Sequence, residues 1–363
     1  DEQLTVALGI GRDGLFSVDL DRDGPHILVA GTTGSGKSEL LQSLVVSLAN
    51  NYGPHEVSFV LIDFKGGAAL GVCATLPHVA GVLTDLELAA VARVVVSLRA
   101  ELRRREVMLA QHHAKDLAQL RQRLPAIAPA RLIVVIDEFA TLREEMPESM
   151  EALVDIARRG RSLGIHLVLG TQRPSGVVDD HLRANVTLRI ALRTVTHEDS
   201  VEVIGSNRAA EISAAVPGRA LVVGRAESRG PELVQIAYGG APPRQTQGPV
   251  VRRFRHLDDL RRSVSGSPGQ ANPHSGRSEV EHLVRHLARQ WDLQNPGQPR
   301  PRYWRDPLPE HLTVEDCGDP TQGHAVVAGL VDLPSESAQE PWSLSLGPIT
   351  CVIGPHGSGR STA

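Results

Sequence analysis

Four continuous apolar runs, each ending in polar residues, recur through the first half of the chain. The runs read "HILVAG", "VSFVLIDF", "RLIVVIDEF" and "IHLVLGTQ", at His26–Gly31, Val57–Phe64, Arg131–Phe139 and Ile165–Gln172. Apolar residues that do not alternate with polar ones are typical of strands buried on both faces, as in a parallel sheet. The pattern therefore predicts such a sheet, and ligands of open parallel sheets bind at the strand ends.

Amphipathic segments separate these runs and indicate crossover helices. The segments predicted as helices are Ser38–Asn50, Asp85–Arg123 and Met150–Ser162, and those predicted as later strands are Val186–Thr194, Gly218–Gly224 and Glu232–Tyr238. We interpret the last two as a closing hairpin. The alternation of apolar runs and helices predicts an α/β fold, with a mostly parallel sheet flanked by helices.

The composition shifts near Gly239, after which Pro, Gly, Ser and Arg dominate. Such stretches are typical of linkers. Apolar spacing predicts one helix there, at Glu279–Leu293, and the strand-like segments "HAVVAGLVDLP" and "LGPITCVIG" come nearer the end. The pattern predicts one domain over 1–239, a linker with one helix over 240–300, and the N-terminal part of a second, truncated domain over 301–363.

Composition and charge narrow the function classes. The 363 residues, 41% of them hydrophobic, allow one large domain or two modest ones. The formal net charge of −4 gives no global attraction to nucleic acid or to an anionic membrane, so any such contact needs a local patch. No apolar run approaches the roughly 18 residues of a membrane span. The sequence starts at Asp1 rather than Met, and we interpret it as a piece of a longer polypeptide.

The three cysteines, Cys73, Cys317 and Cys351, lie far apart and lack the paired spacing of a zinc site. We therefore predict no metal cluster, and interpret the cysteines as reduced thiols.

The motif "GTTGSGKS" carries the clearest chemistry in the chain. Gly31, Gly36, Lys37 and Ser38 match the phosphate-binding loop, which must follow a strand and open a helix, as here. Lys37 is expected to reach the β- and γ-phosphates and Ser38 to hold Mg²⁺. A Gly-rich turn without a ligand is the alternative, and the strand–helix context argues against it. The predicted nucleotide-binding residues are Thr32, Thr33, Gly34, Ser35, Gly36, Lys37, Ser38 and Glu39.

Carboxylates at a second strand end complete the predicted site. The run "LIVVIDEF" ends in Asp137 and Glu138. We expect Asp137 to hold Mg²⁺ through water and Glu138 to be the base that polarises the attacking water. A solvated strand-end pair is the alternative. Gln172, in "GTQRPS", is predicted as a sensor of the γ-phosphate or the water, and Asp63, in "DFKGG", could line the site.

Arginines in "IARRGRSLGIH" suggest a role for a neighbouring subunit. Arg158, Arg159 and Arg161 would ordinarily be solvated on a helix surface. However, ring ATPases often take an arginine from the next subunit, which stabilises the charge of the transition state. An arginine supplied in this way predicts an oligomer.

A second loop, "GPHGSGRS", occurs just before the end of the sequence, at Gly354–Ser361. It matches the phosphate-loop pattern through Gly354, Gly359 and Ser361, but Arg360 stands where the motif has lysine. Guanidinium is broad and planar, whereas an ammonium is a compact point charge. We predict a second module that binds nucleotide without efficient hydrolysis, or that has a regulatory or docking role.

The motifs together resemble the FtsK/SpoIIIE family of ring-forming ATPases. The stretches that carry the resemblance include "PHILVAGTTGSGKSELLQSLVVSLA", "VVIDEF", "ARRGRSLGIHLVLGTQRPS" and "RANVTLRIALR", within Pro25–Gly224. Within that family, "DFKGG", "LPHVAGV" and "ELRRRE" resemble the first ATPase domain of the type VII secretion ATPases EccC and EssC. The tail, from "YWRDPLPEHLTVEDC" to the second loop, resembles the start of their second ATPase domain.

The resemblance implies a RecA-like P-loop fold, ATP hydrolysis with Mg²⁺, and a ring that is hexameric when active. It also implies a secreted protein substrate, membrane components of the secretion system as partners, and a place at the cytoplasmic face of the bacterial membrane. Arg161 falls where the family has its arginine that acts in trans.

Two other functions stay open at this point. The stretch "TQRPSGVVDDHLRANV" is more similar to the DNA translocases of the family, so double-stranded DNA is the alternative substrate. A mainly non-catalytic assembly module, whose tail holds the first domain inactive, is a third interpretation. The intact carboxylate pair argues against that as a permanent state.

Overall fold

The computed structural model describes residues 3–64, 69–84, 88–176, 180–225, 230–242, 278–309, 311–313, 315–317 and 325–345. Some predictions fall outside these residues. They include the second loop, with Gly354, Gly359, Arg360 and Ser361, the strand-like segment "LGPITCVIG" that precedes it, and Cys351.

Ten described strands form one sheet, in the order β2-β1-β10-β9-β8-β3-β7-β6-β4-β5. The strands are β1 (Thr5–Gly11), β2 (Gly14–Asp19), β3 (Ile27–Ala30), β4 (Val57–Asp63), β5 (Val79–Thr84), β6 (Arg131–Asp137), β7 (Ile165–Thr171), β8 (Leu188–Ala191), β9 (Arg219–Val223) and β10 (Glu232–Ile236). From β8 to β5 the neighbours are parallel, and the remaining pairs are antiparallel. The predicted α/β fold with a mostly parallel sheet is confirmed.

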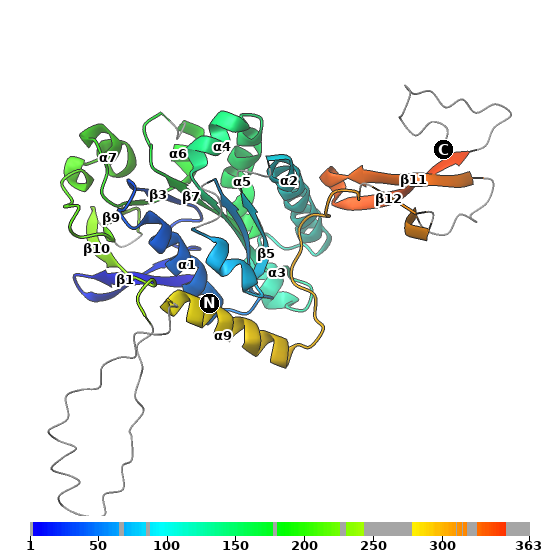
Figure 1. Ribbon diagram of the computed structural model, residues 1–363, viewed down its shortest axis with the longest axis horizontal. Helices are drawn as coiled ribbons and strands as arrows, with labels where there is room; N and C mark the ends of the chain where they lie inside the picture. Colours follow the sequence, from blue (N-terminus) through cyan, green and yellow to red (C-terminus); the bar gives the residue numbers. More distant parts are fainter. Residues whose placement is uncertain are drawn as a thin grey trace, which may run out of the picture.

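Helices cover both faces of the sheet (Figure 1). They are α1 (Lys37–Asn51), α2 (Leu88–Gln111), α3 (Leu117–Arg123), α4 (Phe139–Glu145), α5 (Ser149–Leu163), α6 (Asp180–Asn185), α7 (His197–Ile204) and α9 (Glu279–Gln294), with short 3₁₀ turns at η1 (Gly71–Thr75), η3 (Asn207–Ala209), η4 (Glu315–Cys317) and η5 (Pro334–Glu336). One core lies between the sheet and α2 to α7, and a second core lies between the sheet and α1, η1 and α9.

Strand β6 shows why the apolar runs do not alternate. Leu132, Val134 and Ile136 enter the first core, whereas Ile133 and Val135 enter the second. Both faces of the strand are therefore covered, and every residue of β6 is buried. The continuous apolar pattern is the direct consequence of helices on both sides.

The long helix predicted over 85–123 was wrong, because the chain forms two helices there. Helix α2 ends at Gln111, and His113 then adopts a left-handed backbone conformation (φ 49°). Asp116 begins α3 by accepting a hydrogen bond from Gln119 N at its Oδ1 (2.8 Å). A left-handed residue followed by an N-cap separates two helices even where helix-forming residues continue.

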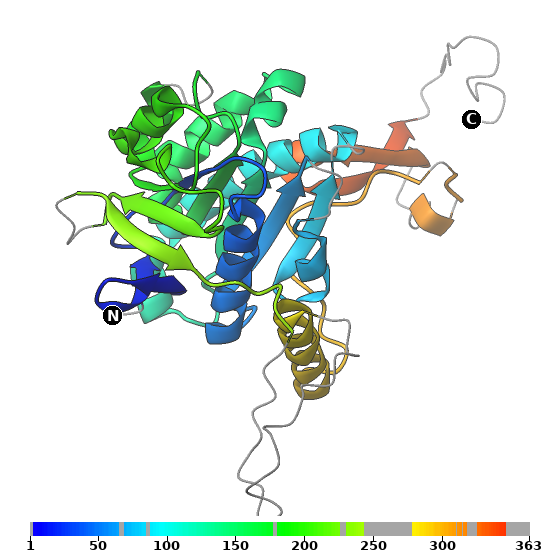
Figure 2. The same ribbon diagram turned by 60° about the vertical axis from the view of Figure 1, so that its left-hand side comes forward.

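The helix predicted within the linker, α9, packs against α1 and η1, and Figure 2 shows it below them. Its residues Val280 and Val284 are buried in the second core. Further along, the Tyr303 hydroxyl forms a hydrogen bond with Ser58 Oγ (2.5 Å), and Trp304 packs against the first core. Several segments after residue 239 thus pack against the sheet domain. The predicted division of the chain into 1–239, 240–300 and 301–363 stays a prediction.

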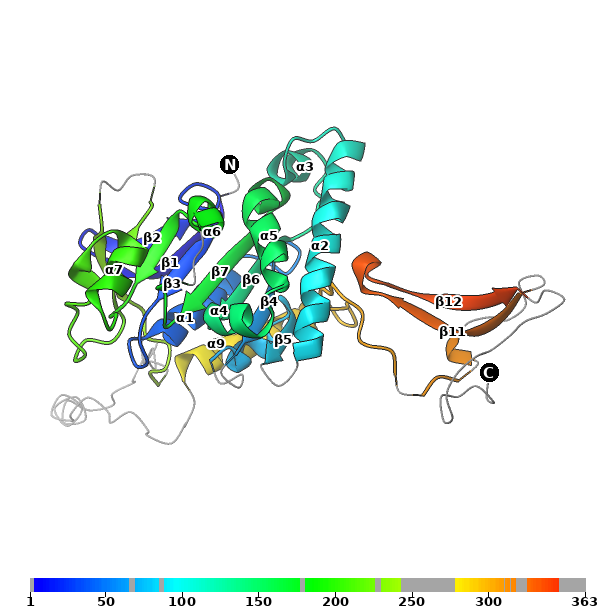
Figure 3. The ribbon, with the colours of Figure 1, turned by 90° about the horizontal axis from the view of Figure 1, so that it is seen from above.

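The C-terminal part of the described chain forms a two-stranded arm beyond α2 (Figure 3). It consists of β11 (Ala325–Leu333) and β12 (Ala338–Ser345), paired antiparallel. The arm is joined to α2 by an ion pair between Arg93 and Asp332 (Nη2–Oδ1 2.6 Å) and by the hydrogen bond from Ser97 Oγ to Pro334 O (3.2 Å). Among the described helices, none combines the length and apolar content that a membrane crossing requires.

Two buried histidines lie near each other, His26 just before β3 and His166 near the start of β7. His26 Nδ1 accepts from Leu167 N (3.0 Å), so Nε2 carries the proton that it donates to Ala157 O (3.0 Å). His166 donates from Nδ1 to Pro25 O (2.9 Å). Burial, and then the neighbouring His166, lowers the pKa of His26 to about 3; burial lowers the pKa of His166 to about 4. Both rings are therefore neutral at pH 7.

Acidification below pH 6.5 is expected to destabilise the fold through these histidines. Their pKa values are lower in the folded chain than the unfolded value of 6.5, so the unfolded state binds more protons between about pH 4 and 6.5. Stability then falls as the pH falls through that window, by up to about 1.4 kcal/mol per histidine per pH unit. Urea unfolding between pH 7 and pH 5 measures this loss.

A pair of variants identifies the source of the loss. His26→Gln is expected to reduce the pH slope but not abolish it, because burial also lowers the pKa of His166 and of His78, whereas replacing the exposed His282 on α9 by Gln leaves the slope intact. A wild-type free energy of unfolding that stays constant from pH 7 to pH 5 would contradict the prediction.

Candidate nucleotide site

The loop "GTTGSGKS" connects β3 to α1 at the carboxyl edge of the parallel strands. Backbone hydrogen bonds fix it to both neighbouring strands. Gly31 N donates to Thr171 O at the end of β7 (3.1 Å), and Thr32 N donates to Arg193 O just after β8 (2.9 Å). The loop therefore starts from a rigid position in the middle of the sheet.

Two glycines allow the loop to press against β9. Gly36 has φ 100°, a conformation that side chains rarely adopt, and a Cβ there would lie 2.8 Å from Gly218 N. Gly218 N in turn donates to Ser35 O (2.7 Å). The phosphate loop and the start of β9 are thus in direct backbone contact.

A cavity of about 630 Å³ opens over this loop, within the size range of small-molecule sites. The loop, the start of α1 and the residue after β7 line it with Thr32, Thr33, Gly34, Gly36, Lys37, Ser38, Glu39 and Gln172. A second wall, next to β9 and β10, consists of Pro217, Gly218, Ile236, Ala237 and Tyr238. Of the residues predicted to bind nucleotide, Ser35 is the one that does not line the cavity; its side chain is buried beneath the loop.

Lys37 and Asp137 form a buried ion pair at the base of the loop. Lys37 opens α1 and Asp137 is the last residue of β6, and their side chains are 3% and 0% exposed. Each of these buried charges compensates part of the desolvation cost of the other, because a buried charge without a counter-charge is strongly destabilising. The structure therefore brings the predicted phosphate and magnesium residues together.

Glu138 follows Asp137 in a left-handed backbone conformation (φ 63°, ψ 57°). This is unfavourable for a residue with a side chain, and such strain is concentrated at functional sites. Oε1 of Glu138 accepts from Gln172 N (3.1 Å) and from Thr171 Oγ1 (3.4 Å), both at the end of β7. The carboxylate is thereby held between the ends of β6 and β7, beside the cavity.

Gln172 connects the phosphate loop to Glu138. Its side-chain Oε1 accepts from Thr33 Oγ1 in the loop (3.0 Å), while its backbone N donates to Glu138. A change in the position of Thr33 would therefore reach Gln172 directly. The geometry suits the predicted sensor, and that role stays a prediction.

Several buried polar atoms at this site have no hydrogen-bond partner within the described protein: Thr32 Oγ1, Ser35 Oγ and Asp137 Oδ2. Buried polar atoms are nearly always paired in folded proteins. Their clustering around the loop fits phosphate oxygens and the water shell of Mg²⁺, which would supply the missing partners. The role of Ser38 and Asp137 in holding the metal stays a prediction.

Arg161 lies far from the phosphate loop of its own chain. It is exposed in the last turn of α5, before β7 begins at the opposite edge of the sheet, and Nη2 donates to Asp21 O (3.1 Å). Arg159, by contrast, pairs with Glu106 (2.8 Å) and Asp155 (3.3 Å) on its own domain. An action of Arg161 on this site within one chain is excluded by that placement, and its action in trans stays a prediction.

Asp63 does not line the cavity, which corrects the expectation that it could. Its Oδ2 accepts from Ala69 N (3.0 Å) and Leu70 N (3.2 Å), and its side chain is fully buried. Asp63 therefore fixes the chain that comes after β4.

The sequence did not predict the wall at residues 217–218 and 236–238. It did predict the hairpin that carries these residues, but nothing in the sequence indicated that the hairpin contacts the phosphate loop.

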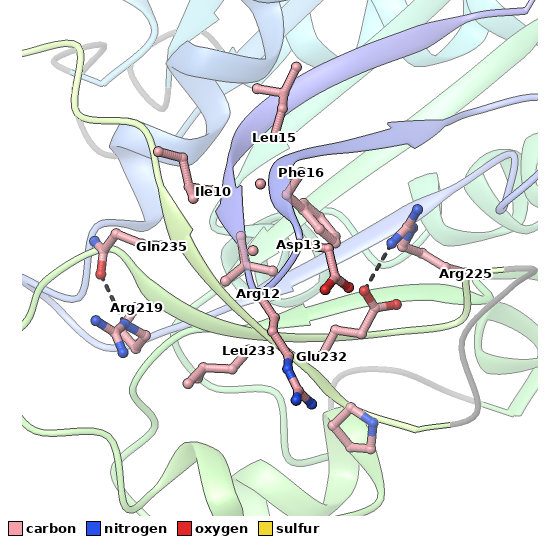
Figure 4. A pocket seen from close by; sticks show the side chains of 14 residues that line it. Ile10, Arg12, Asp13, Leu15, Phe16, Arg219, Arg225, Glu232, Leu233 and Gln235 are labelled. Atoms are coloured by element: carbon pink, nitrogen blue, oxygen red, sulfur yellow. Dashed lines mark hydrogen bonds and ion pairs between the residues drawn. The ribbon is translucent and has the colours of Figure 1, made fainter.

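A larger cavity lies elsewhere and is lined by none of the predicted site residues (Figure 4). It measures about 950 Å³ and lies between the β1–β2 hairpin and the β9–β10 hairpin. Some of its side chains interact with one another: Arg225 forms an ion pair with Glu232 (2.9 Å), and Arg219 donates a hydrogen bond to Gln235 (2.9 Å). It shares no residue with the nucleotide cavity, and the motif chemistry singles out the smaller one.

Comparisons with known proteins agree on one family. Residues 1–176 match the FtsK/SpoIIIE family. The type VII secretion system protein EssC of Staphylococcus aureus (strain NCTC 8325 / PS 47) is 36% identical over 392 residues, which covers 99% of this chain and 26% of that protein. The ESX secretion system protein EccC of Geobacillus thermodenitrificans (strain NG80-2) is 35% identical over 376 residues, covering 99% and 25%. The chain thus spans about a quarter of the curated relatives it matches.

A solved structure agrees with the sequence comparisons. The cytoplasmic domain of the type VII secretion ATPase EccC of Thermomonospora curvata is 29% identical and superimposes with a TM-score of 0.74, over 94% of this chain and 39% of that one. The likeness therefore extends beyond the sheet domain into the later part of the chain.

Proposed function

Since residues 1–176 belong to the FtsK/SpoIIIE family, whose members are ATPases, we propose that this chain is the ATP-hydrolysing motor domain of a ring-forming translocase. Protein export by a type VII secretion system is the proposed work of the motor. The observation that carries the proposal is the contact of the predicted carboxylates with the cavity residues. Lys37 and Gln172 line the cavity above the phosphate loop, and just outside its lining Asp137 pairs with Lys37 and Glu138 accepts from Gln172 N.

Each group in and beside the cavity has a separate role in the proposed reaction. Backbone N–H groups of the loop and the start of α1 bind the phosphates, where the helix dipole favours negative charge. Lys37 neutralises charge on the β- and γ-phosphates. Glu138, held beside the cavity by Gln172 N and Thr171, accepts a proton from the attacking water. Gln172 orients that water or the γ-phosphate through the side chain that now contacts Thr33.

Mg²⁺, held by Ser38 directly and by Asp137 through water, would neutralise charge developing on the phosphates. Asp137 is paired with Lys37 in this structure. Its second oxygen, Oδ2, is buried and has no hydrogen-bond partner among the described residues. This oxygen is therefore the one available to a metal-bound water.

The relatives named EssC and EccC, together with their near-complete coverage of this chain, support protein export as the work of the motor. The proposed partners are an exported protein, membrane components of the secretion system and further copies of the chain, in a hexameric ring at the cytoplasmic face of the membrane. The alternative substrate, double-stranded DNA, is favoured by the stretch "TQRPSGVVDDHLRANV" at the end of β7 and beyond it.

Mixing two inactive variants is expected to restore ATP hydrolysis, because Arg161 acts on a neighbouring site. In a mixture of Arg161→Ala and Glu138→Gln chains, some interfaces pair an intact Glu138 with an intact Arg161. The turnover of the mixture should exceed the sum of the separate variants several-fold at concentrations where rings form. Steady-state phosphate release at increasing protein concentration measures it.

Arg158, exposed one turn earlier on α5, provides the matched control: Arg158→Ala should retain wild-type turnover. A mixture that is no more active than its components, in protein shown to be oligomeric, would contradict the action of Arg161 in trans.

A further inference from the structure

One wall of the nucleotide cavity is formed by residues next to β9 and β10. Pro217 and Gly218 precede β9, Ile236 ends β10, and Ala237 and Tyr238 come directly after it. The phosphate-binding loop lines the same cavity. A nucleoside whose phosphates lie in the loop therefore has this wall beside it.

The wall is fixed to the phosphate loop and supported from behind. Gly218 N donates to Ser35 O (2.7 Å), which connects wall and loop. Gln235, seen in the cavity of Figure 4, donates from Nε2 to Pro217 O (2.9 Å) and accepts from Arg219 Nε (2.9 Å). The distance between the phosphates and the wall is thus set by the fold.

Tyr238 presents an aromatic ring at this wall. A Cβ placed on Gly240 would lie 2.8 Å from ring atoms of Tyr238, so the ring rests against the bare backbone of that glycine. The tyrosine is nevertheless 65% exposed. One part of the ring is supported by Gly240, and a large part remains open beside the cavity.

Four of the five wall residues have no backbone donor left for a ligand. Gly218 N donates to Ser35 O, Ile236 N to Gly218 O (2.8 Å) and Ala237 N to Leu8 O (2.9 Å), and Pro217 has no N–H. These four described residues therefore offer no backbone donor to the edge of a base. What this wall offers a base is apolar surface and the face of an aromatic ring.

We propose that Tyr238 holds the nucleobase by stacking, and that the site accepts purine nucleoside triphosphates with little discrimination between adenine and guanine. The proposal rests on the proposed ATPase function, which it extends to the choice of base. Stacking is tolerant of base identity because every base has a π-face. An apolar wall without edge contacts separates similar ligands only weakly.

Calorimetric titration of the full chain with ATP, GTP and inorganic tripolyphosphate tests the proposal. Tyr238→Ala is expected to weaken ATP and GTP binding by between about fivefold and a hundredfold, the range measured for loss of one stacked base. Tripolyphosphate has no base, so its affinity should stay unchanged. Tyr238→Phe should bind all three ligands as the wild type does. The wild type should bind ATP and GTP within about tenfold of each other.

Leu233→Ala is the matched control. Leu233 is exposed on β10, just before Tyr238 in the chain, but lines the cavity of Figure 4 instead, so its variant should bind ATP normally. ATP binding by Tyr238→Ala that equals the wild type, or a loss of tripolyphosphate affinity as large as that of ATP, would overturn the stacking role. A preference for ATP over GTP far above tenfold would overturn the weak discrimination.

Lys37→Met separates this proposal from the function on which it rests. If the wild type binds ATP and Lys37→Met does not, the phosphate site is upheld and Tyr238 alone is under test. If the wild type binds neither ATP nor tripolyphosphate, the proposed function and the stacking role both fail.

Discussion

Replacing Glu138 by Gln is expected to lower ATP turnover by about a hundredfold or more, with ATP binding retained. General-base catalysis contributes between about a hundredfold and ten-thousandfold, and the amide cannot accept the proton. Gln has the shape of Glu, and its carbonyl oxygen can still accept from Gln172 N and Thr171 Oγ1. The variant should therefore fold and bind nucleotide but release phosphate very slowly.

Glu144, exposed on α4, provides the control for this substitution. Glu144→Gln should have the turnover and the ATP affinity of the wild type. Turnover of Glu138→Gln within threefold of the wild type would contradict the assignment of the base. Loss of ATP binding in that variant would instead point to a structural role for the carboxylate.

Replacing Lys37 by Met is expected to weaken ATP binding at least about a hundredfold, because the charged hydrogen bonds to the phosphates are lost. The structure adds a second consequence. Lys37 is the partner of Asp137, and both are buried, so the substitution leaves a carboxylate in the interior without its counter-charge. Removing one partner of a buried ion pair costs about 3 kcal/mol or more, so the free energy of unfolding should fall by that amount.

The double variant Lys37→Met/Asp137→Asn separates the two effects. Without the charge of Asp137, most of the lost stability should return, since a buried pair replaced as a whole is nearly neutral. ATP binding should not return. Chemical unfolding and calorimetry of the three proteins measure both quantities. A double variant as unstable as Lys37→Met would contradict the importance of the ion pair.

The sequence predicted the parts of the fold that depend on local pattern. The buried parallel strands were predicted because helices on both faces, as around Val134 and Val135, leave no polar positions in the middle of β6. The phosphate loop was predicted because its glycines, lysine and serine have a fixed spacing between a strand and a helix. In both cases the information lies within a few consecutive residues.

The parts that were missed depend on contacts between distant segments. The β1–β2 hairpin at one edge of the sheet has short strands interrupted by glycine, and its pairing with β10 spans almost the whole first domain. The wall at Pro217 and Tyr238 is part of the site only because Gly218 meets the loop at Ser35. The sequence likewise gives no sign of the left-handed backbone at Glu138. It predicts only that this residue follows a strand.

The arginine predicted to act in trans shows a further limit of prediction from the sequence. The helix surface of α5 carries three arginines in four positions, and only Arg161 was selected, by resemblance. The structure separates Arg159, which is engaged on its own domain, from Arg161, which is exposed near the end of the helix. The structure of a single chain shows that difference between the two arginines. It does not show a contact between Arg161 and the nucleotide site of a neighbouring chain, because such a contact would form only in an oligomer.

We propose that this chain hydrolyses ATP for protein export rather than for movement along DNA. The initial rate of phosphate release by this chain with Mg²⁺ and ATP, in the presence and absence of double-stranded DNA and with Glu138→Gln as the blank, distinguishes the two functions. We expect a turnover that disappears in Glu138→Gln and is unchanged by DNA. A Glu138-dependent turnover that DNA increases several-fold would contradict it and assign the chain to the DNA translocases.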